Sequence, residues 1–275
     1  MGEVCGIIAG AGAFPLHVAQ EAKRQGFTVV GIGLKDWADP SLTRHVDVYE
    51  EIPVGQLGKL IRCLKTHHVR QVIMAGKITK DVLFDARVAF DLDALAILGK
   101  VRDFSVNGLL GAIGEKLTQQ GVTLLDSSTF LKQDLCPVGV LTTRQPTPVE
   151  REDVRVGVRA ARKLAELDVG QTVLVKERVI VAVEALEGTD AAITRAGALA
   201  NGGLVLVKMA SATQDMRFDL PILGPQTIAM ARQAGVTCVA VEAHKTLLLD
   251  RAQLLAHANE AKISLLGVDP NTDNS

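Results

Sequence analysis

A short apolar run that ends in a glycine turn opens the chain, and it limits the possible fold more than any other feature. Val4-Cys-Gly-Ile-Ile-Ala9 is followed by Gly10-Ala-Gly12-Ala13 and then by Pro15. Proline suits the first turn of a helix, where its missing N–H group has no partner to lose. We therefore predict a strand, a tight turn and a helix here, the first unit of an α/β fold.

Two interpretations of this turn remain open. Gly10, Ala11, Gly12 and Ala13 could bind phosphate through backbone N–H groups and the helix N-terminus, or they could form an ordinary tight turn. Asp36 follows the next predicted strand, where an acid can hold a ribose hydroxyl. A nucleotide-cofactor oxidoreductase of the NAD type is therefore one alternative, and a non-catalytic nucleotide-binding module is another.

The chain divides into two predicted domains, which its length of 275 residues allows. Strand and helix patterns predict a Rossmann-like parallel sheet over residues 1–134, with the stretch 79–120 mainly helical. Residues 135–149 are rich in Pro and Thr and are expected to form a linker. Residues 150–275 contain a predicted hairpin over 171–183, so the second, catalytic α/β domain should have a mixed sheet.

Composition excludes several classes of function. The 30 basic and 31 acidic residues leave a formal net charge of −1, and aromatic residues make up only 3%, so we expect no nucleic-acid partner. Cys5, Cys63, Cys136 and Cys238 lie far apart, as reduced thiols of a cytoplasmic protein do. No uncharged apolar run reaches about 18 residues, so any membrane contact should be peripheral.

Charged residues occur where predicted strands end. Lys77 follows the strand Gln71-Val-Ile-Met-Ala75, and Lys208 follows the apolar run Gly203-Leu-Val-Leu-Val207. The second half adds Glu187, Asp190, Asp215, Arg217 and Asp219. Ligands of open α/β sheets usually bind at the carboxyl ends of strands, so the groups of the second half could converge on one cleft.

Such a set of charges suits one kind of chemistry. Carboxylates are ligands for Mg²⁺ or Mn²⁺, and Lys and Arg neutralise phosphoryl oxygens, although solvated loop charges would give the same pattern. Thr189 could bind substrate or, with Asp190, cap the following helix.

The order of motifs along the chain resembles one known family. The motifs include Gly10-Ala-Gly12 with Pro15, Met74-Ala-Gly-Lys77, Gly139-Val-Leu-Thr-Thr-Arg144, Ala182-Val-Glu-Ala-Leu-Glu-Gly-Thr-Asp190 and Asp219-Leu-Pro-Ile-Leu-Gly-Pro225. From Gly6 to about Val268 the chain resembles the LpxI-type UDP-2,3-diacylglucosamine pyrophosphatases of Gram-negative lipid A synthesis. It departs from the family pattern at Val106-Asn107-Gly108, where a pair of aspartates is expected.

The resemblance implies a two-domain hydrolase that depends on Mg²⁺ or Mn²⁺ and cuts the pyrophosphate of UDP-2,3-diacylglucosamine. The products would be UMP and 2,3-diacylglucosamine 1-phosphate, known as lipid X. The partner would be this lipid-linked UDP-sugar, and the enzyme would be cytoplasmic with peripheral contact at the inner membrane. A homodimer is expected because symmetric dimers are the commonest oligomers.

The resemblance also gives roles to residues. The turn from Gly10 to Ala13, helped by Lys77, would bind substrate phosphate or nucleotide. The metal ligands would be Asp219, Glu187 and Asp190, and the catalytic residues would be Asp219, Asp215, Lys208 and Arg217. Which carboxylate is a general base and which is a ligand stays open, because both roles use the same side chains.

Overall fold

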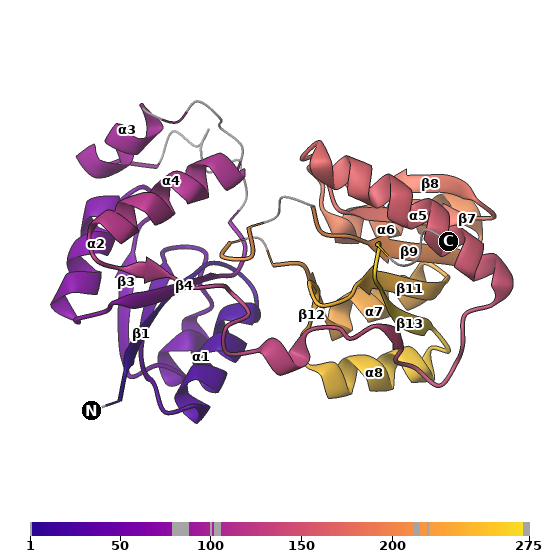
Figure 1. Cartoon of the computed structure of the whole chain (residues 1–275), viewed down its shortest axis with the longest axis horizontal. Coiled ribbons are helices and arrows are strands. Elements are labelled where there is room, and N and C mark those ends of the chain that lie inside the picture. Colours follow the sequence, from indigo (N-terminus) through magenta and orange to yellow (C-terminus); the bar gives the residue numbers. More distant parts are fainter. Residues whose placement is uncertain are drawn as a thin grey trace. The chain divides into compact units, whose positions relative to one another are not determined.

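The computed structural model of the chain describes residues 2–78, 88–99, 101, 106–211, 215–218 and 220–271, with only the backbone of residues 106 and 107. The chain forms two compact units (Figure 1). The N-terminal unit comprises Met1–Lys132 and Asp215–Asp219, and the C-terminal unit comprises Gln133–Gln214 and Leu220–Ser275. The predicted class, α/β with a parallel N-terminal sheet and a mixed C-terminal sheet, is confirmed.

The N-terminal unit is built on a five-stranded sheet in the order β3-β2-β1-β4-β5, and all its strand pairs are parallel. Its strands are β1 (Val4–Ala9), β2 (Thr28–Leu34), β3 (Val48–Ile52), β4 (Gln71–Ala75) and β5 (Thr123–Leu124). The inner strands β1 and β2 are buried along almost their whole length, as expected for parallel strands covered on both faces.

Helices cover this sheet (Figure 1). They are α1 (Phe14–Arg24), α2 (Leu57–Thr66), α3 (Leu92–Leu98) and α4 (Val106–Gln119). Leu64 of α2 and Leu117 of α4 are fully buried in one apolar cluster with Ile32 of β2 and Val72 of β4. The stretch 79–120 was predicted to be mainly helical, and α3 and α4 lie in it; residues 79–87 are outside the described part.

A segment from the second half of the sequence completes the N-terminal unit. The backbone N–H of Ser127 donates to the carbonyl of Met216 at 2.9 Å. The buried Ser127 hydroxyl lies 2.9 Å from the carbonyl oxygen of Met74 and 2.8 Å from that of Arg217. Phe218 packs against the N-terminal apolar core. These contacts hold residues 215–218 beside the end of β4, although the sequence assigned them to the second domain.

The C-terminal unit has a six-stranded sheet in the order β6-β13-β11-β9-β7-β8. Its strands are β6 (Gly139–Val140), β7 (Thr172–Lys176), β8 (Val179–Val183), β9 (Leu204–Lys208), β11 (Val236–Glu242) and β13 (Ser264–Val268). The predicted hairpin β7–β8 is confirmed, and β9, β11 and β13 run parallel to one another. Two short strands, β10 (Ile222–Leu223) and β12 (Leu247–Leu248), pair separately.

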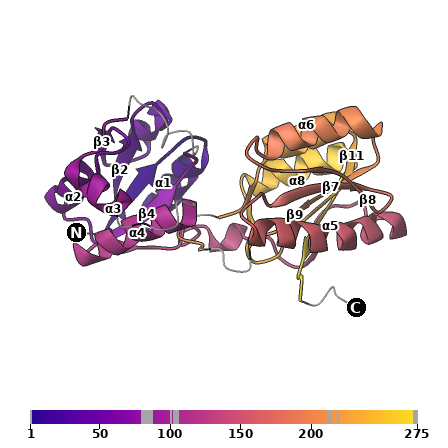
Figure 2. The same cartoon turned by 90° about the horizontal axis from the view of Figure 1, so that it is seen from above.

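Helices lie on both faces of this sheet (Figure 2). One face packs against α5 (Pro148–Glu166), and the other packs against α6 (Thr189–Ala200), α7 (Pro225–Gln233) and α8 (Arg251–Glu260). The alternation of β9 explains the two faces, because Leu204 and Leu206 belong to the cluster with α6 to α8. Val205 and Val207 belong to the cluster with α5.

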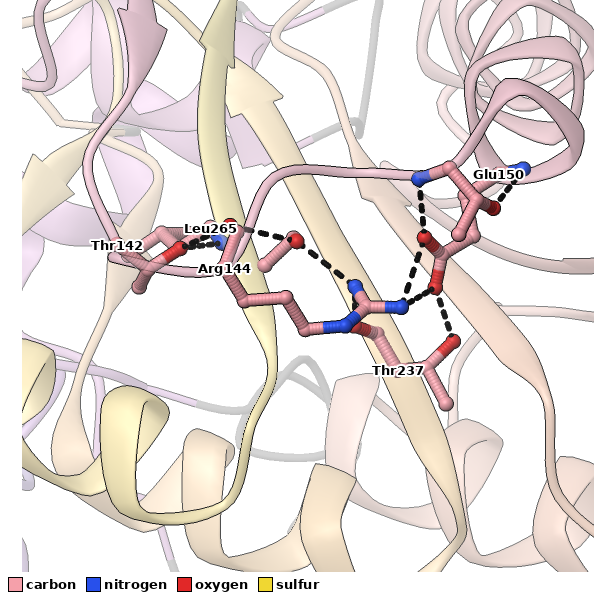
Figure 3. Close-up of polar contacts among 7 residues, drawn as sticks. Thr142, Arg144, Glu150, Thr237 and Leu265 are labelled. Atoms are coloured by element: carbon pink, nitrogen blue, oxygen red, sulfur yellow. Dashed lines mark hydrogen bonds and ion pairs between the residues drawn. The ribbon is translucent and has the colours of Figure 1, made fainter.

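The segment 135–149, expected to be a linker, is part of the C-terminal unit. Its strand β6 pairs antiparallel with β13. Beyond β6, the guanidinium of Arg144 reaches the hydroxyl of Ser264 at 2.8 Å, and its second terminal nitrogen lies 2.9 and 3.0 Å from the two carboxylate oxygens of Glu150 (Figure 3). The residues that anchor this segment are polar, which explains why a pattern of apolar residues did not reveal them.

Glu150 stands in the centre of that network. It lies in the first turn of α5 and is 6% exposed, and it accepts hydrogen bonds from Arg144, the Thr237 hydroxyl and the backbone N–H of Thr147. Burial by itself would raise the pKa of Glu150, but these hydrogen bonds outweigh burial and hold the pKa below its ordinary value. The carboxylate is therefore ionised in the folded protein at neutral pH.

Arg144→Met should destabilise the C-terminal unit by about 2–4 kcal/mol, because Glu150 would stay buried without its cation. Calorimetric unfolding at pH 7 measures the loss. The control is Arg155→Met, which removes the exposed ion pair of Arg155 with Glu152 on the same helix and should cost at most about 1 kcal/mol. Equal effects of the two substitutions would contradict a central role for Arg144.

The same network predicts the direction of a pH dependence. Because the folded-state pKa of Glu150 is depressed, its contribution to stability is present above the unfolded value of about 4.3 and is lost as pH falls through the lower folded value. The stability difference between the native protein and Arg144→Met should therefore shrink between pH 6 and pH 3. A difference that stays constant over this range would contradict the assignment.

Candidate functional site

The N-terminal sheet has a topological switch point between β1 and β4, because the strand order reverses there. Ligands of open parallel sheets bind outside the carboxyl ends of strands at such a point. The turn Gly10 to Ala13 follows β1, and Gly76 and Lys77 follow β4. The structure therefore brings the predicted phosphate-binding turn and Lys77 to one edge of the sheet.

The two loops at this edge are paired through their backbones. The N–H of Ala11 donates to the carbonyl of Lys77, and the N–H of Lys77 donates to the carbonyl of Ala11, both at 2.9 Å. The N–H of Gly10 donates to Ala75 at 2.8 Å. The N–H groups of Gly10 and Ala11 are thus engaged, and the exposed residues Gly12 and Ala13 are the part of the turn that remains for an anion.

Glycine is required where the loops meet. A Cβ atom on Gly10 would lie 2.6 Å from the carbonyl oxygen of Lys77, which belongs to the backbone and cannot rotate away. Gly12 has a φ of +96°, a conformation that other residues rarely adopt. The glycines of the fingerprint therefore serve loop packing and turn geometry, whichever ligand the edge binds.

Asp215 and Arg217 lie in the segment that Ser127 holds beside the end of β4. They form a two-fold ion pair with each other, with Arg217 nitrogen atoms 2.6 and 2.9 Å from the two Asp215 carboxylate oxygens. The hydrogen bonds from Arg217 lower the pKa of Asp215 and the carboxylate raises the pKa of Arg217. Both groups are charged at neutral pH, and the Arg217 side chain is 42% exposed.

One face of the C-terminal sheet ends in a row of three polar side chains, those of Glu184, Thr172 and Lys208. Thr172 pairs with Lys208 across β7 and β9, and the backbone N–H of Glu184 donates to the carbonyl of Thr172 at 2.8 Å. Paired residues on neighbouring strands point to the same face. Lys208 lies two positions after Leu206 and four after Leu204, so all three side chains point to one face of the sheet. The row therefore lies on the face that α6 covers, at the carboxyl end of β9.

Thr189 connects the two charged residues of this row. Its hydroxyl donates to Oε1 of Glu184 at 2.8 Å and lies 3.5 Å from Nζ of Lys208. Thr189 is the first residue of α6, whose preceding residue Gly188 provides no side-chain cap. Glu184 and Lys208 are each 8% exposed, so a carboxylate and an ammonium group are buried beside the N-terminus of a helix. This end of a helix and a lysine together attract phosphate.

Several buried oxygen atoms at this end of the sheet have no hydrogen-bond partner among the described residues. They are Oε2 of Glu184, Oγ1 of Thr172, Oε1 of Gln171 and Oγ1 of Thr246. Glu242, on the opposite face of the sheet, differs, because one oxygen is 2.9 Å from Lys245 and the other accepts the N–H of Ala210 at 2.9 Å. The unpaired atoms distinguish the Glu184 row from ordinary buried structure.

The predicted metal ligands lie near the start of α6 where they are described. Glu187 and Asp190 are exposed, and Glu187 is paired with Arg195 at 2.6 Å. Hydrogen bonds from its own backbone and from Arg195 lower the pKa of Glu187. Asp219 lies outside the described residues. Within the described ranges, no group of three or more His, Cys, Asp or Glu side chains is placed to hold a metal.

Cysteine chemistry has no support at either sheet edge. All four cysteines are free, and burial raises the pKa of Cys5, Cys136 and Cys238 to about 12. A thiol needs a lowered pKa to act as a nucleophile near neutral pH. These buried cysteines are therefore packing residues.

The structure divides the predicted cluster of charges between the two units. Lys208, Thr189, Glu187 and Asp190 belong to the C-terminal unit, whereas Asp215 and Arg217 belong to the N-terminal unit. Sequence reasoning gave no role to Glu184, Thr172 or Ser127. A signal existed for Glu184, since it is an acid placed directly after the apolar strand β8.

Comparison with known protein families decides the classification. The LpxI N-terminal domain matches residues 4–134, and the LpxI C-terminal domain matches residues 137–266. The chain belongs to the LpxI family. A curated relative from Caulobacter vibrioides, strain ATCC 19089 / CIP 103742 / CB 15, is 31% identical over 277 residues, which cover 96% of this chain and 97% of the relative. That relative is named UDP-2,3-diacylglucosamine pyrophosphatase LpxI.

Solved structures are much more distant from this LpxI-family chain. A UDP-glucose-4-epimerase from Stenotrophomonas maltophila is 18% identical, covers 44% of this chain and 35% of its own, and has a TM-score of 0.29. CobK precorrin-6A reductase is 12% identical, covers 98% of this chain and 88% of its own, and also has a TM-score of 0.29. Neither likeness is close enough to inform the fold or the function.

Gly10→Ala should destabilise the N-terminal unit by about 1–3 kcal/mol, because the new methyl group would collide with the Lys77 carbonyl. Urea unfolding followed by the fluorescence of Trp37, the sole tryptophan, measures this unit. The control is Gly111→Ala in α4, where a Cβ atom meets nothing within 4 Å and helix propensity improves. An unchanged midpoint for Gly10→Ala would contradict the close packing of the two loops.

Proposed function

We propose that the protein hydrolyses the pyrophosphate bond of UDP-2,3-diacylglucosamine in lipid A biosynthesis, releasing UMP and 2,3-diacylglucosamine 1-phosphate (lipid X). The observation that carries this proposal is the whole-length relationship to the Caulobacter pyrophosphatase. It favours hydrolysis over the NAD-type oxidoreductase and over a non-catalytic nucleotide-binding module, because both alternatives rest on the glycine turn and its surroundings alone.

The reaction asks little covalent chemistry of the protein. A water oxygen forms a bond to one phosphorus, the bridging P–O bond breaks, and the departing phosphate keeps the electron pair. Catalysis then depends on orienting the water and neutralising the phosphoryl oxygens. Lys208 and the N-terminus of α6 supply positive potential in the C-terminal unit. Gly12, Ala13, Lys77 and Arg217 offer a second set of donors in the N-terminal unit.

We further propose dependence on Mg²⁺ or Mn²⁺. The donor set is compatible with these ions, because Glu187 and Asp190 are exposed carboxylates near the start of α6, and hard cations prefer oxygen ligands. Asp219, the third proposed ligand, lies outside the described residues, and Glu187 would have to release Arg195 to bind an ion. A bound divalent cation would supply charge neutralisation at the phosphoryl oxygens. Asp215 remains a candidate for orienting the water, in competition with its pairing to Arg217.

The lipid-linked substrate makes membrane contact part of the proposal. None of the described helices is long and apolar enough to cross a bilayer. Two acyl chains favour a bilayer over water, so we propose that the enzyme meets its substrate peripherally at the cytoplasmic face of the inner membrane. We retain the homodimer as a proposal, which light scattering during size-exclusion chromatography tests directly.

Incubation of the purified protein with UDP-2,3-diacylglucosamine and Mg²⁺ should yield UMP and lipid X, detected by mass spectrometry. EDTA should abolish product formation, and Asp219→Ala should remove turnover while the protein stays folded. Lys208→Met should lower kcat by about 100-fold or more, as expected for loss of a group that stabilises transition-state charge. Reaction in ¹⁸O-labelled water would reveal which phosphorus is attacked, because the label appears in that product.

A matched lysine provides the control. Lys163→Met removes an exposed ion pair with Glu166 and should leave kcat unchanged. Intact substrate after incubation with the folded native protein would refute the proposed activity. Full activity in EDTA would refute the metal requirement alone, and full activity of Lys208→Met would remove that residue from the mechanism.

A further inference from the structure

We infer that Glu184 is a positioning residue, which acts through the Thr189 hydroxyl to set the place of the Lys208 ammonium group. The inference deepens the proposed function and rests on it for its catalytic consequence. Neither the sequence motifs nor the family relationship assigned Glu184 a role.

The Thr189 hydroxyl carries a single proton, and its two neighbours compete for its orientation. A carboxylate only accepts hydrogen bonds, and a lysine ammonium only donates them. With Oε1 of Glu184 at 2.8 Å, the hydroxyl proton points to Glu184. The lone pairs of the hydroxyl oxygen are then available to Lys208, whose Nζ lies 3.5 Å away, at the long end of hydrogen-bond range. Glu184 therefore decides the orientation in which Thr189 meets Lys208.

Burial makes both charged groups costly to the folded protein. Glu184 and Lys208 are each 8% exposed, and charged groups are almost never buried to this extent unless they are paired. Thr172 on β7 pairs with Lys208 on β9 and lies beside Glu184, which follows β8. The opposite charges of Glu184 and Lys208 therefore lie on the same face of the sheet. The hydroxyl bridge gives this pair a fixed geometry at the carboxyl end of β9.

Glu184 differs from other buried acids of the C-terminal unit. Glu150 and Glu242 have both carboxylate oxygens satisfied, as structural acids should. Oε2 of Glu184 is buried and has no partner within the described part of the chain. The described part of the chain therefore has an incompletely satisfied carboxylate at this end of the sheet. A buried oxygen without a hydrogen-bond partner costs stability and does not add to it, which favours a functional role for Glu184 in the site.

The test uses substitutions on both sides of the bridge. Glu184→Ala removes the acceptor, and Thr189→Val removes the hydroxyl at constant shape. Each should lower kcat by about 10- to 100-fold, the usual cost of losing a residue that orients a functional group. The double substitution should be no worse than the more damaging single one, because both remove the same bridge. Glu184→Gln should recover most of the lost kcat, because the amide oxygen still accepts from Thr189.

A structural role would give a different result. The two losses in kcat would then multiply in the double variant, and Glu184→Gln would recover none of the activity. Glu166→Ala, an exposed acid of α5, is the control and should match the native enzyme in kcat. Native kcat in Glu184→Ala, multiplying losses, or no recovery in Glu184→Gln would each overturn the inference.

A binding experiment separates this inference from the proposed function. Calorimetric titration with inorganic pyrophosphate probes Lys208 without catalysis, and Lys208→Met defines the loss expected when the lysine is absent. Weaker binding by Glu184→Ala and Thr189→Val, together with an inactive native protein, would reject the lipid substrate and keep the positioning role. Native affinity in both variants, with an inactive native protein, would reject both proposals.

Discussion

In the C-terminal unit, one apolar face of the sheet ends in a buried charged residue, and the local structure depends on how that charge is compensated. Leu204 and Leu206 are fully buried on this face, and Lys208 continues the same alternation into the site. An isolated buried ammonium group would be too costly, so the carboxylate and hydroxyl that accompany it are a condition for the strand to end there. The sheet thus fixes a cation at a defined point, and the start of α6 adds its own positive potential.

Much of the fold could be predicted because it follows from local patterns. The buried run Val4–Ala9 predicts a strand, and Pro15 stands in the first turn of the helix α1 that follows it, as predicted. The course of segment 135–149 and the crossing at residues 215–218 could not be predicted in this way. Their anchors, Arg144 and Ser127, are polar side chains whose partners lie far away in sequence, and apolar periodicity carries no information about such partners.

The candidate site was predictable in outline and not in detail. A lysine at the end of a buried strand and a glycine turn after β1 are signals that sequence alone supplies, and both lie at the carboxyl ends of strands. The mutual pairing of Asp215 with Arg217 depends on side-chain direction, which a list of charges does not contain. The bridge from Glu184 to Thr189 likewise arises only when β8 and the start of α6 fold together.

The crossing at residues 215–218 has a consequence for synthesis. A nascent chain that has emerged as far as Lys132 contains all five strands of the N-terminal sheet, yet Ser127 lacks the backbone that covers it and the core lacks Phe218. Completion waits until the ribosome has also released β6 to β9. Folding of the N-terminal unit therefore cannot be completed before much of the C-terminal unit has been synthesised. A gene divided at the apparent boundary between the two units would give a first product with an uncovered apolar surface.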